Sequence, residues 1–194
     1  SQNVKYSAEE NNTWFSLYNE QILNLCDLAW DRVLECINEL SLPKNHIPQL
    51  GEVSEKLYKK TGWQVVQVED LIDGDAFFQL LSNRMFPSTI YIRGNTEASL
   101  AEDEDIFHSK DPDIFHELFG HCPLLLDAEY ANLFEKFGQI GLQLDKVQRM
   151  FFQRLFWFTF ETGLVHTPVG LKVYGGSLLS SIKESRYAVD NPLP

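Results

Sequence analysis

Two histidines five positions apart stand out as candidate metal ligands, in the segment His116-Glu117-Leu118-Phe119-Gly120-His121. Neutral imidazole suits borderline transition metals. A zinc protease places its two histidines four apart on one helix face, whereas a spacing of five puts His116 and His121 about 140° apart on an ideal helix. The rings converge only if the helix widens locally or ends between them, and Gly120 and Pro123 favour an end. The segment alone is equally compatible with two ordinary histidines, one of which caps a helix C-terminus.

A third candidate ligand, Glu161, closes the run Phe156-Trp157-Phe158-Thr159-Phe160-Glu161. This run predicts a helix without a polar face, and a carboxylate in such surroundings is rare unless it is paired or binds a metal. Arg154 lies two turns back on the same face, so a salt bridge between them is the simpler alternative. Two histidines and one carboxylate form the facial ligand set of non-haem iron(II) enzymes. The same set also serves a catalytic zinc.

The elements that must position these ligands are mainly helical in pattern. Apolar residues recur at three- and four-residue steps from Trp14 to Ala29, and Ser7 with Glu10 resembles a capping box ahead of them. Runs rich in β-branched and aromatic residues predict strands instead. Further helices are predicted over 33–40, 52–60, 75–83, 130–138 and 180–188, and short strands over 63–68, 88–93 and 171–174.

Two predicted helices carry the candidate ligands. Asp111-Pro112-Asp113 is typical of a helix start, with a capping acid, proline at the first helical position and an acid in the first turn. Residues 147–164 predict one long helix that is apolar nearly all round, which is typical of a buried helix. Residues 94–109 are expected to form a polar loop. The fold class is therefore mainly α with a small β element.

Composition restricts the partners and the compartment. The 194 residues include 16 basic and 28 acidic side chains, a net charge of -12, which argues against nucleic acid or an anionic membrane as the main partner. Three cysteines are too few for a disulfide framework, and no apolar run is long enough to span a bilayer. We therefore expect a cytoplasmic protein with no nucleic-acid or membrane partner.

Several motifs, in order and spacing, resemble the pterin-dependent aromatic amino acid hydroxylases. They are Thr61-Gly62-Trp63 through Tyr91-Ile92-Arg93, residues 112–121, residues 156–164 and Tyr174-Gly175-Gly176-Ser177-Leu178-Leu179-Ser180-Ser181. The resemblance covers most of the chain and is greatest to bacterial members that hydroxylate phenylalanine. It implies a single catalytic, iron- and pterin-binding domain over residues 1–194. It also implies that the chain is truncated at its C-terminus, because the family continues beyond the position of Pro194.

The resemblance also implies the cofactors and the residues that hold them. Iron(II) is expected at His116, His121 and Glu161. A tetrahydropterin, either tetrahydrobiopterin or a related compound, and O2 as co-substrate are expected to react there. Phe77 stands where the family stacks an aromatic ring on the pterin, and Glu117 stands where a carboxylate contacts it. Glu117 is therefore also a candidate catalytic residue.

The amino acid substrate is expected beside the metal. Arg93 corresponds to the arginine that pairs with the substrate carboxylate. Pro112 and Trp157 fall in the wall around the substrate ring, which makes Trp157 a second candidate catalytic residue. Ser180 and Ser181 fall near the substrate and the first histidine. We expect the partner to be a small molecule, and the protein to be a monomer or a weak oligomer.

Three positions depart from the family pattern. Phe156 stands where many members have tyrosine, Thr162 replaces a common phenylalanine, and Ser177 replaces a glycine. The preferred hypothesis is hydroxylation of L-phenylalanine to L-tyrosine, with hydroxylation of tryptophan or tyrosine as the alternative within the family. A zinc-dependent hydrolase with Glu117 as general base, and a helical interaction domain without catalysis, are the alternatives of other classes.

Overall fold

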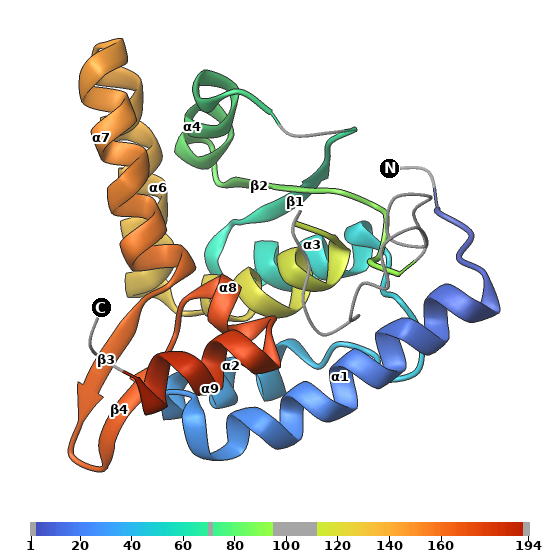
Figure 1. Ribbon diagram of the computed structural model, residues 1–194. Coiled ribbons are helices and arrows are strands. Elements are labelled where there is room, and N and C mark those ends of the chain that lie inside the picture. The colour runs from blue at the N-terminus through green and yellow to red at the C-terminus, as the bar shows by residue number, and fades with distance from the viewer. Residues whose placement is uncertain (1–2, 70–71, 95–111, 192–194) are drawn as a thin grey trace.

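The first element of the fold is a long helix. In the computed structural model, which describes residues 3–69, 72–94 and 112–191, helix α1 (Ala8–Leu28) runs along one side of the molecule (Figure 1). The predicted capping box is confirmed, because Ser7 accepts the Glu10 backbone N–H while the Glu10 side chain accepts that of Ser7. Trp14 and Leu25 are completely buried on its inner face.

A small parallel sheet follows the next two helices. Figure 1 shows α2 (Asp31–Leu40), α3 (Leu50–Thr61), β1 (Gln64–Gln67), α4 (Gly74–Ser82) and β2 (Met85–Ser88). Gly62 ends α3, where its φ of 80° requires the left-handed conformation that glycine adopts without strain. Strands β1 and β2 pair in parallel, with Val65 beside Phe86, and α4 forms the crossover between them.

The second half of the chain carries the candidate ligands. Ile114 and Phe115 are α-helical and lead directly into a π-helical turn. The elements in order are η1 (His116–His121), η2 (Pro123–Leu126), α6 (Ala128–Gln143), α7 (Lys146–Phe156), η3 (Trp157–Glu161), β3 (Leu164–Thr167), β4 (Gly170–Val173), α8 (Gly176–Leu179) and α9 (Ile182–Asp190). Strands β3 and β4 form an antiparallel hairpin.

One hydrophobic core surrounds the histidine turn. Phe119, within η1, packs edge-on against Tyr18 of α1, and His121 at the end of η1 lies 5.2 Å from the ring of Phe86 in β2. Helix α9 packs beside α1, so segments from the two ends of the chain lie side by side (Figure 1). The predicted fold class, mainly α with a small β element, is confirmed. None of the helices that the structure describes is both long and apolar enough to cross a membrane.

The strand predicted over 88–93 is wrong for most of its length. Strand β2 ends at Ser88, because the ladder of β1 ends opposite it at Gln67, and residues beyond a ladder have no backbone partner to hold them extended. The chain turns instead toward the histidine segment, where the Ile114 backbone N–H donates to the Tyr91 carbonyl. The strand predicted over 171–174 is confirmed as β4, whereas its partner β3 was not predicted.

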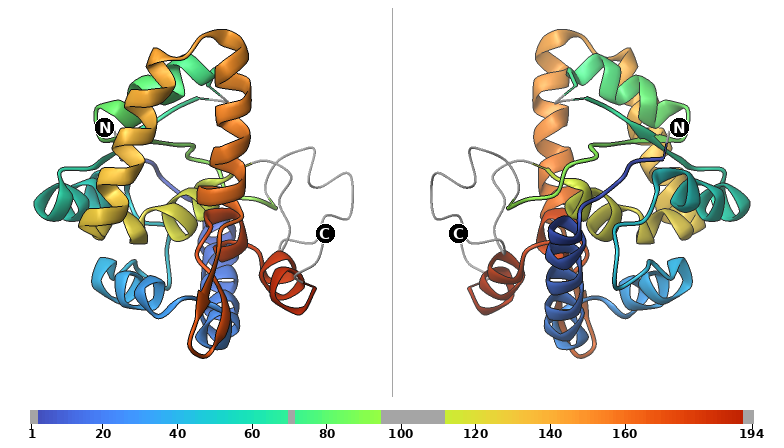
Figure 2. Two further views of the ribbon diagram at one scale, coloured as in Figure 1. Left: turned by 90° about the vertical axis from the view of Figure 1, so that its left-hand side faces the viewer. Right: turned by 90° about the vertical axis from the view of Figure 1, so that its right-hand side faces the viewer.

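The helix predicted over 147–164 differs in both length and burial. Helix α7 changes to a π-turn after Phe156, and the chain leaves it at Gly163 for β3. None of the α7 residues, all of which the structure describes, is buried, and Phe151 is 58% exposed. A helix that is apolar on every side is buried only where neighbouring elements cover it. Helix α7 has little such cover, because it joins α6 at one end and then diverges from it (Figure 2).

The predicted helix start at Asp111 is also corrected. Asp111 lies outside the described residues, as do 95–109 of the predicted loop, and Pro112 is not helical. Asp113 takes the capping role, because its Oδ1 accepts the His116 backbone N–H at 3.0 Å. The cap therefore lies two residues nearer to the metal ligands than predicted.

Candidate metal centre and pocket

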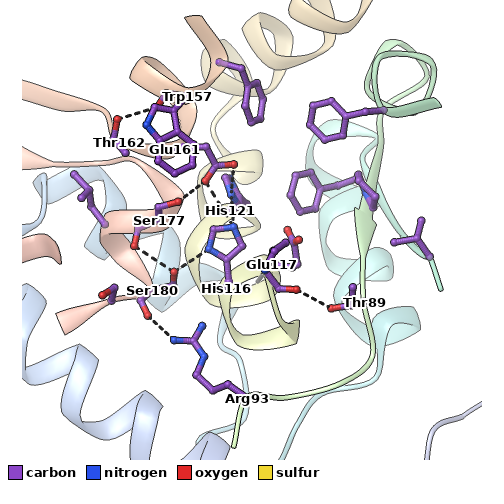
Figure 3. A pocket seen from close by; sticks show the side chains of 18 of the residues that line it. Thr89, Arg93, His116, Glu117, His121, Trp157, Glu161, Thr162, Ser177 and Ser180 are labelled. Carbon is purple, nitrogen blue, oxygen red and sulfur yellow. Dashed lines mark hydrogen bonds and ion pairs between the residues drawn. The ribbon is translucent and has the colours of Figure 1, made fainter. Parts of the chain in front are cut away.

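A pocket of about 680 Å³ lies between the two π-turns, α4 and α8 (Figure 3). Its walls come from segments that are far apart in the sequence, including the loop after β2. All ten residues that the sequence predicted for the site line this one pocket: Phe77, Arg93, Pro112, His116, Glu117, His121, Trp157, Glu161, Ser180 and Ser181.

A widened helical turn brings the two histidines together. Residues His116–His121 form the π-helix η1, and the Cys122 backbone N–H donates to the Glu117 carbonyl five residues earlier. Because a π-turn bonds residue i to i+5, side chains five apart lie one above the other. The Nε2 atoms of His116 and His121 are 3.1 Å apart. Of the two predicted routes to convergence, the wider turn is the one observed.

Close packing explains why the histidine turn includes a glycine. A Cβ on Gly120 would lie 2.5 Å from the Gly176 carbonyl oxygen, and a Cβ on Gly176 would collide with the His121 ring. Larger residues at either position would push α8 away from η1. The two glycines therefore let α8 lie directly against the histidine turn.

The carboxylate of Glu161 completes the group from a second π-turn. Its Oε1 lies 3.3 Å from Nε2 of His121, and its Oε2 lies 3.6 Å from Nε2 of His116. The three candidate ligand atoms lie within 4.8 Å of one another. The alternative partner for Glu161 is not supported, because Arg154 lies over the Phe151 ring and no ion pair between Arg154 and Glu161 occurs in the described structure.

This arrangement fits a bound cation. Two imidazole nitrogens and a carboxylate converge, and the other nitrogen of His116 is within 2.9 Å of the Ser180 hydroxyl. That hydroxyl can accept a hydrogen bond from Nδ1–H, which leaves Nε2 of His116 as a lone-pair donor facing the pocket. Nδ1 of His121 is buried and has no hydrogen-bond partner among the described residues. Two imidazole nitrogens and a carboxylate that face one another are the donor set of a transition-metal site.

The protonation states also favour metal binding. Burial lowers the pKa of His116 to about 4, so the ring is neutral near pH 7. Burial alone would raise the pKa of Glu161, but the imidazoles of His121 and His116 and the Ser177 hydroxyl lower it to about 2. The carboxylate is therefore ionised. Both groups are in the form that a divalent metal requires.

Glu117 has the opposite electrostatics. It lies partly exposed on the pocket wall, yet burial raises its pKa well above the ordinary value, and the carboxylates of Glu161 and Asp113 raise it further. A protonated carboxyl donates a hydrogen bond instead of accepting a proton.

The predicted substrate arginine already has a protein partner. Arg93 donates from Nε and Nη2 to the two oxygens of Asp113, at 2.8 and 2.6 Å, and from Nη1 to the Ser180 carbonyl. Both members of this ion pair are buried, and the carboxyl of Asp113 also accepts the Arg93 backbone N–H. Three of the five guanidinium N–H groups are therefore used within the described structure, which leaves one N–H on each terminal nitrogen.

The other predicted contacts line different parts of the pocket. Phe77 lies edge-on to Phe156, with ring centroids 5.1 Å apart. Trp157 is 54% exposed. The Pro112 carbonyl accepts the Tyr91 hydroxyl at 2.8 Å, so Pro112 is held by the loop after β2. Ser181 caps α9, and this structural role was not foreseen.

Asp113 is a residue of the site that the sequence reasoning missed. It was interpreted only as a first-turn acid, but it fixes Arg93 and caps the histidine turn at the same time. The signal available in the sequence was an acid three residues before a candidate ligand. Thr162, a departure from the family pattern, helps to close the second π-turn, because its hydroxyl donates to the Trp157 carbonyl at 2.8 Å.

Comparison with known proteins gives the family. The family model for biopterin-dependent aromatic amino acid hydroxylases matches residues 2–193. Phenylalanine-4-hydroxylase of Pseudomonas aeruginosa is 39% identical over 191 residues, covering 98% of this chain and 70% of that protein. The apo structure of the cold-active phenylalanine hydroxylase from Colwellia psychrerythraea is 44% identical, with a TM-score of 0.91 over 97% of this chain and 69% of that one.

A second solved structure of similar fold contains both iron and phenylalanine. The iron- and phenylalanine-bound phenylalanine hydroxylase of Chromobacterium violaceum is 37% identical, with a TM-score of 0.85, and the match covers 97% of this chain and 66% of that one. The chain thus spans about two thirds of the length of these relatives. Both the family model and the identities confirm the resemblance that the motifs indicated, and the chain belongs to the biopterin-dependent aromatic amino acid hydroxylases.

Proposed function

We propose that residues 1–194 form a single catalytic domain that hydroxylates L-phenylalanine to L-tyrosine with iron(II), a tetrahydropterin and O2. The observation that carries the proposal is the convergence of His116, His121 and Glu161 at one side of a pocket large enough for a cofactor and a substrate. Curated relatives named phenylalanine-4-hydroxylase, at 35–39% identity, support phenylalanine as the substrate.

The three ligands would hold iron(II) and leave positions open toward the pocket. When bound, iron and the reduced pterin would supply the oxygen activation and two electrons, so that one oxygen atom of O2 enters an aromatic C–H bond as a hydroxyl and the other is reduced to the level of water. The remaining work belongs to side chains of this chain. They bind the two organic molecules, orient them toward the open positions and keep water away from the reacting ring.

On the pterin side, Phe77 offers an aromatic face and Glu117 offers a polar contact. Stacking on an aromatic ring supplies contact area without ligation. Because the pKa of Glu117 is raised well above its ordinary value, its carboxyl would donate a hydrogen bond to an acceptor on the heterocycle.

On the substrate side, Arg93 would receive the amino acid carboxylate. The two N–H groups that Asp113 and Ser180 leave unused can form a pair of hydrogen bonds to one carboxylate. Trp157 and Pro112 would form the wall around the ring. Ser180 would keep His116 in the tautomer that binds the metal. We expect a monomer or a weak oligomer in the cytoplasm.

The test is product formation under defined loading. The protein is loaded anaerobically with iron(II), and tetrahydropterin, O2 and one of phenylalanine, tryptophan or tyrosine are added. Tyrosine formed from phenylalanine, and only when both iron and pterin are present, is the expected result. Preferential turnover of tryptophan or tyrosine would assign a different substrate within the family, and ester or peptide hydrolysis with zinc alone would refute the proposal.

A further inference from the structure

The ligand Glu161 has a hydrogen-bond donor that the motifs did not indicate. The Ser177 hydroxyl donates to Oε2 of Glu161 at 2.6 Å, and both side chains are partly buried (Figure 3). A bond this short to an ionised carboxylate is charge-assisted and is worth more than an ordinary hydrogen bond. Ser177 occupies the position where the sequence departs from the glycine of the family pattern.

The bond distinguishes the two oxygens of the carboxylate. Oε1 is the oxygen nearer to a histidine nitrogen, at 3.3 Å from His121, whereas Oε2 lies 3.6 Å from His116 and accepts the Ser177 proton. An oxygen that accepts a strong hydrogen bond is a poorer metal donor, because its lone-pair density is shared with the proton. The hydrogen bond therefore favours binding of the metal through Oε1 alone.

Ser177 also lies on the element that orients another ligand. It belongs to α8, which packs against both π-turns, and Ser180 at the end of α8 contacts Nδ1 of His116. Ser180 also donates weakly to the Ser177 carbonyl. One short helix thus reaches two of the three ligands, and the glycines at its contact with η1 allow this approach.

We infer that Ser177 is a positioning residue that holds Glu161 as a one-oxygen ligand and keeps a coordination position of the metal open. The inference rests on the proposed metal centre. Without the hydroxyl, Oε2 is free to rotate toward the metal and occupy a second position. Loss of the Ser177 hydroxyl would then change the coordination number of the metal as well as the affinity of the site for it.

Cobalt(II) provides a readout that does not depend on turnover. Its visible absorption bands lose intensity when the coordination number rises, so they report whether Glu161 binds through one oxygen or two. The variants are Ser177→Ala, which removes the hydroxyl, and Ser177→Thr, which keeps it. The matched control is Ser185→Ala, which removes a buried hydroxyl bonded to Asn24 and the Ile182 carbonyl, outside the pocket lining.

We expect Ser177→Ala to weaken cobalt binding by about tenfold, as is usual for removal of a hydrogen bond to a ligand, and to lower the band intensity. Ser177→Thr and Ser185→Ala should bind as the parent does. Parent-like affinity and spectrum in Ser177→Ala would overturn the inference and leave the metal centre intact. Binding as weak in Ser177→Thr as in Ser177→Ala would also overturn it, because the hydroxyl would then not be the cause. A parent protein that binds no cobalt would refute the metal centre itself.

Discussion

The two π-turns carry metal ligands in opposite surroundings. Within η1, four of the six residues are buried, and Phe119 stacks on Phe115 with ring centroids 4.8 Å apart. Within η3, Phe160 is the buried residue, and Phe158 is 70% exposed. Helix α7, which leads into η3, buries none of its residues. The same local geometry therefore occurs once inside the core and once at the end of an exposed helix.

This difference separates two ways of holding a ligand. The core fixes the histidines, because moving either ring would disturb the packing around η1. The carboxylate is held instead by the Ser177 hydroxyl and through its neighbour Phe160, whose ring centroid lies 4.5 Å from that of Phe134. Substitutions near η1 should therefore change the stability of the fold, whereas substitutions near η3 should change the chemistry of the site.

Removal of a buried ring from η1 should destabilise the fold more than any other substitution considered for the two turns. Phe119→Ala should lower the free energy of unfolding by about 3–5 kcal/mol, because it leaves a cavity in a fully buried aromatic cluster. The matched control is Phe151→Ala on α7, which should change it by no more than about 0.5 kcal/mol. Chemical denaturation of both variants measures the difference. Equal losses would show that α7 is packed as firmly as η1.

A smaller loss is expected at the buried ion pair beside η1. Arg93→Lys keeps the charge but loses the double hydrogen bond to Asp113, and should cost about 1.5–3 kcal/mol of stability. Because Asp113 also caps the histidine turn, metal affinity should fall as well as phenylalanine affinity. Denaturation and metal titration of the variant measure the two effects. Unchanged metal affinity would show that Arg93 serves the substrate alone.

The same ion pair predicts a pH dependence. Burial alone would raise the pKa of Asp113, but Arg93 and the backbone N–H groups hold it below its usual value of about 3.9. As the pH falls, the carboxyl of Asp113 therefore takes up its proton at a higher pH in the unfolded chain than in the folded one. The stabilisation that the ion pair contributes is present above about pH 4 and is lost as the pH falls below it. Between pH 6 and pH 3, the free energy of unfolding should fall more steeply with pH for the parent than for Asp113→Asn, which cannot titrate. An equal pH dependence in the two proteins would contradict the assignment of this titration to Asp113.

The smallest effect concerns the pterin wall. Phe77→Ala should weaken tetrahydropterin binding by about 0.5–1.5 kcal/mol beyond the lost contact area, while metal occupancy stays at the level of the parent. Phe77 also contacts Phe156 and Phe78, so the melting temperature is measured beside the pterin titration. Global unfolding without a specific pterin defect would identify Phe77 as a core residue instead.

The sequence predicted which residues meet in the pocket better than it predicted the elements that position them. The candidate ligands and the pocket residues followed from motifs, because residue types and spacing are local properties. The spacing of His116 and His121 left a wide turn and a helix end as alternatives, and only the structure decides for the wide turn. The exposure of α7 could not be predicted, since an apolar helix looks the same with or without neighbours. Asp113 and Ser177 were missed as contacts because their partners, Arg93 and Glu161, are brought to them only by the tertiary fold.

The most direct test of the metal centre is the equilibrium binding of iron(II), measured anaerobically for the parent and for His116→Ala, His121→Ala and Glu161→Ala. We expect one iron per chain in the parent and a loss of affinity of at least about a hundredfold in each variant, because a three-residue site has no spare ligand. The thermal stability of each metal-free variant serves as the control for folding. Parent-like iron occupancy in any two of the three variants, with the fold intact, would contradict the assignment.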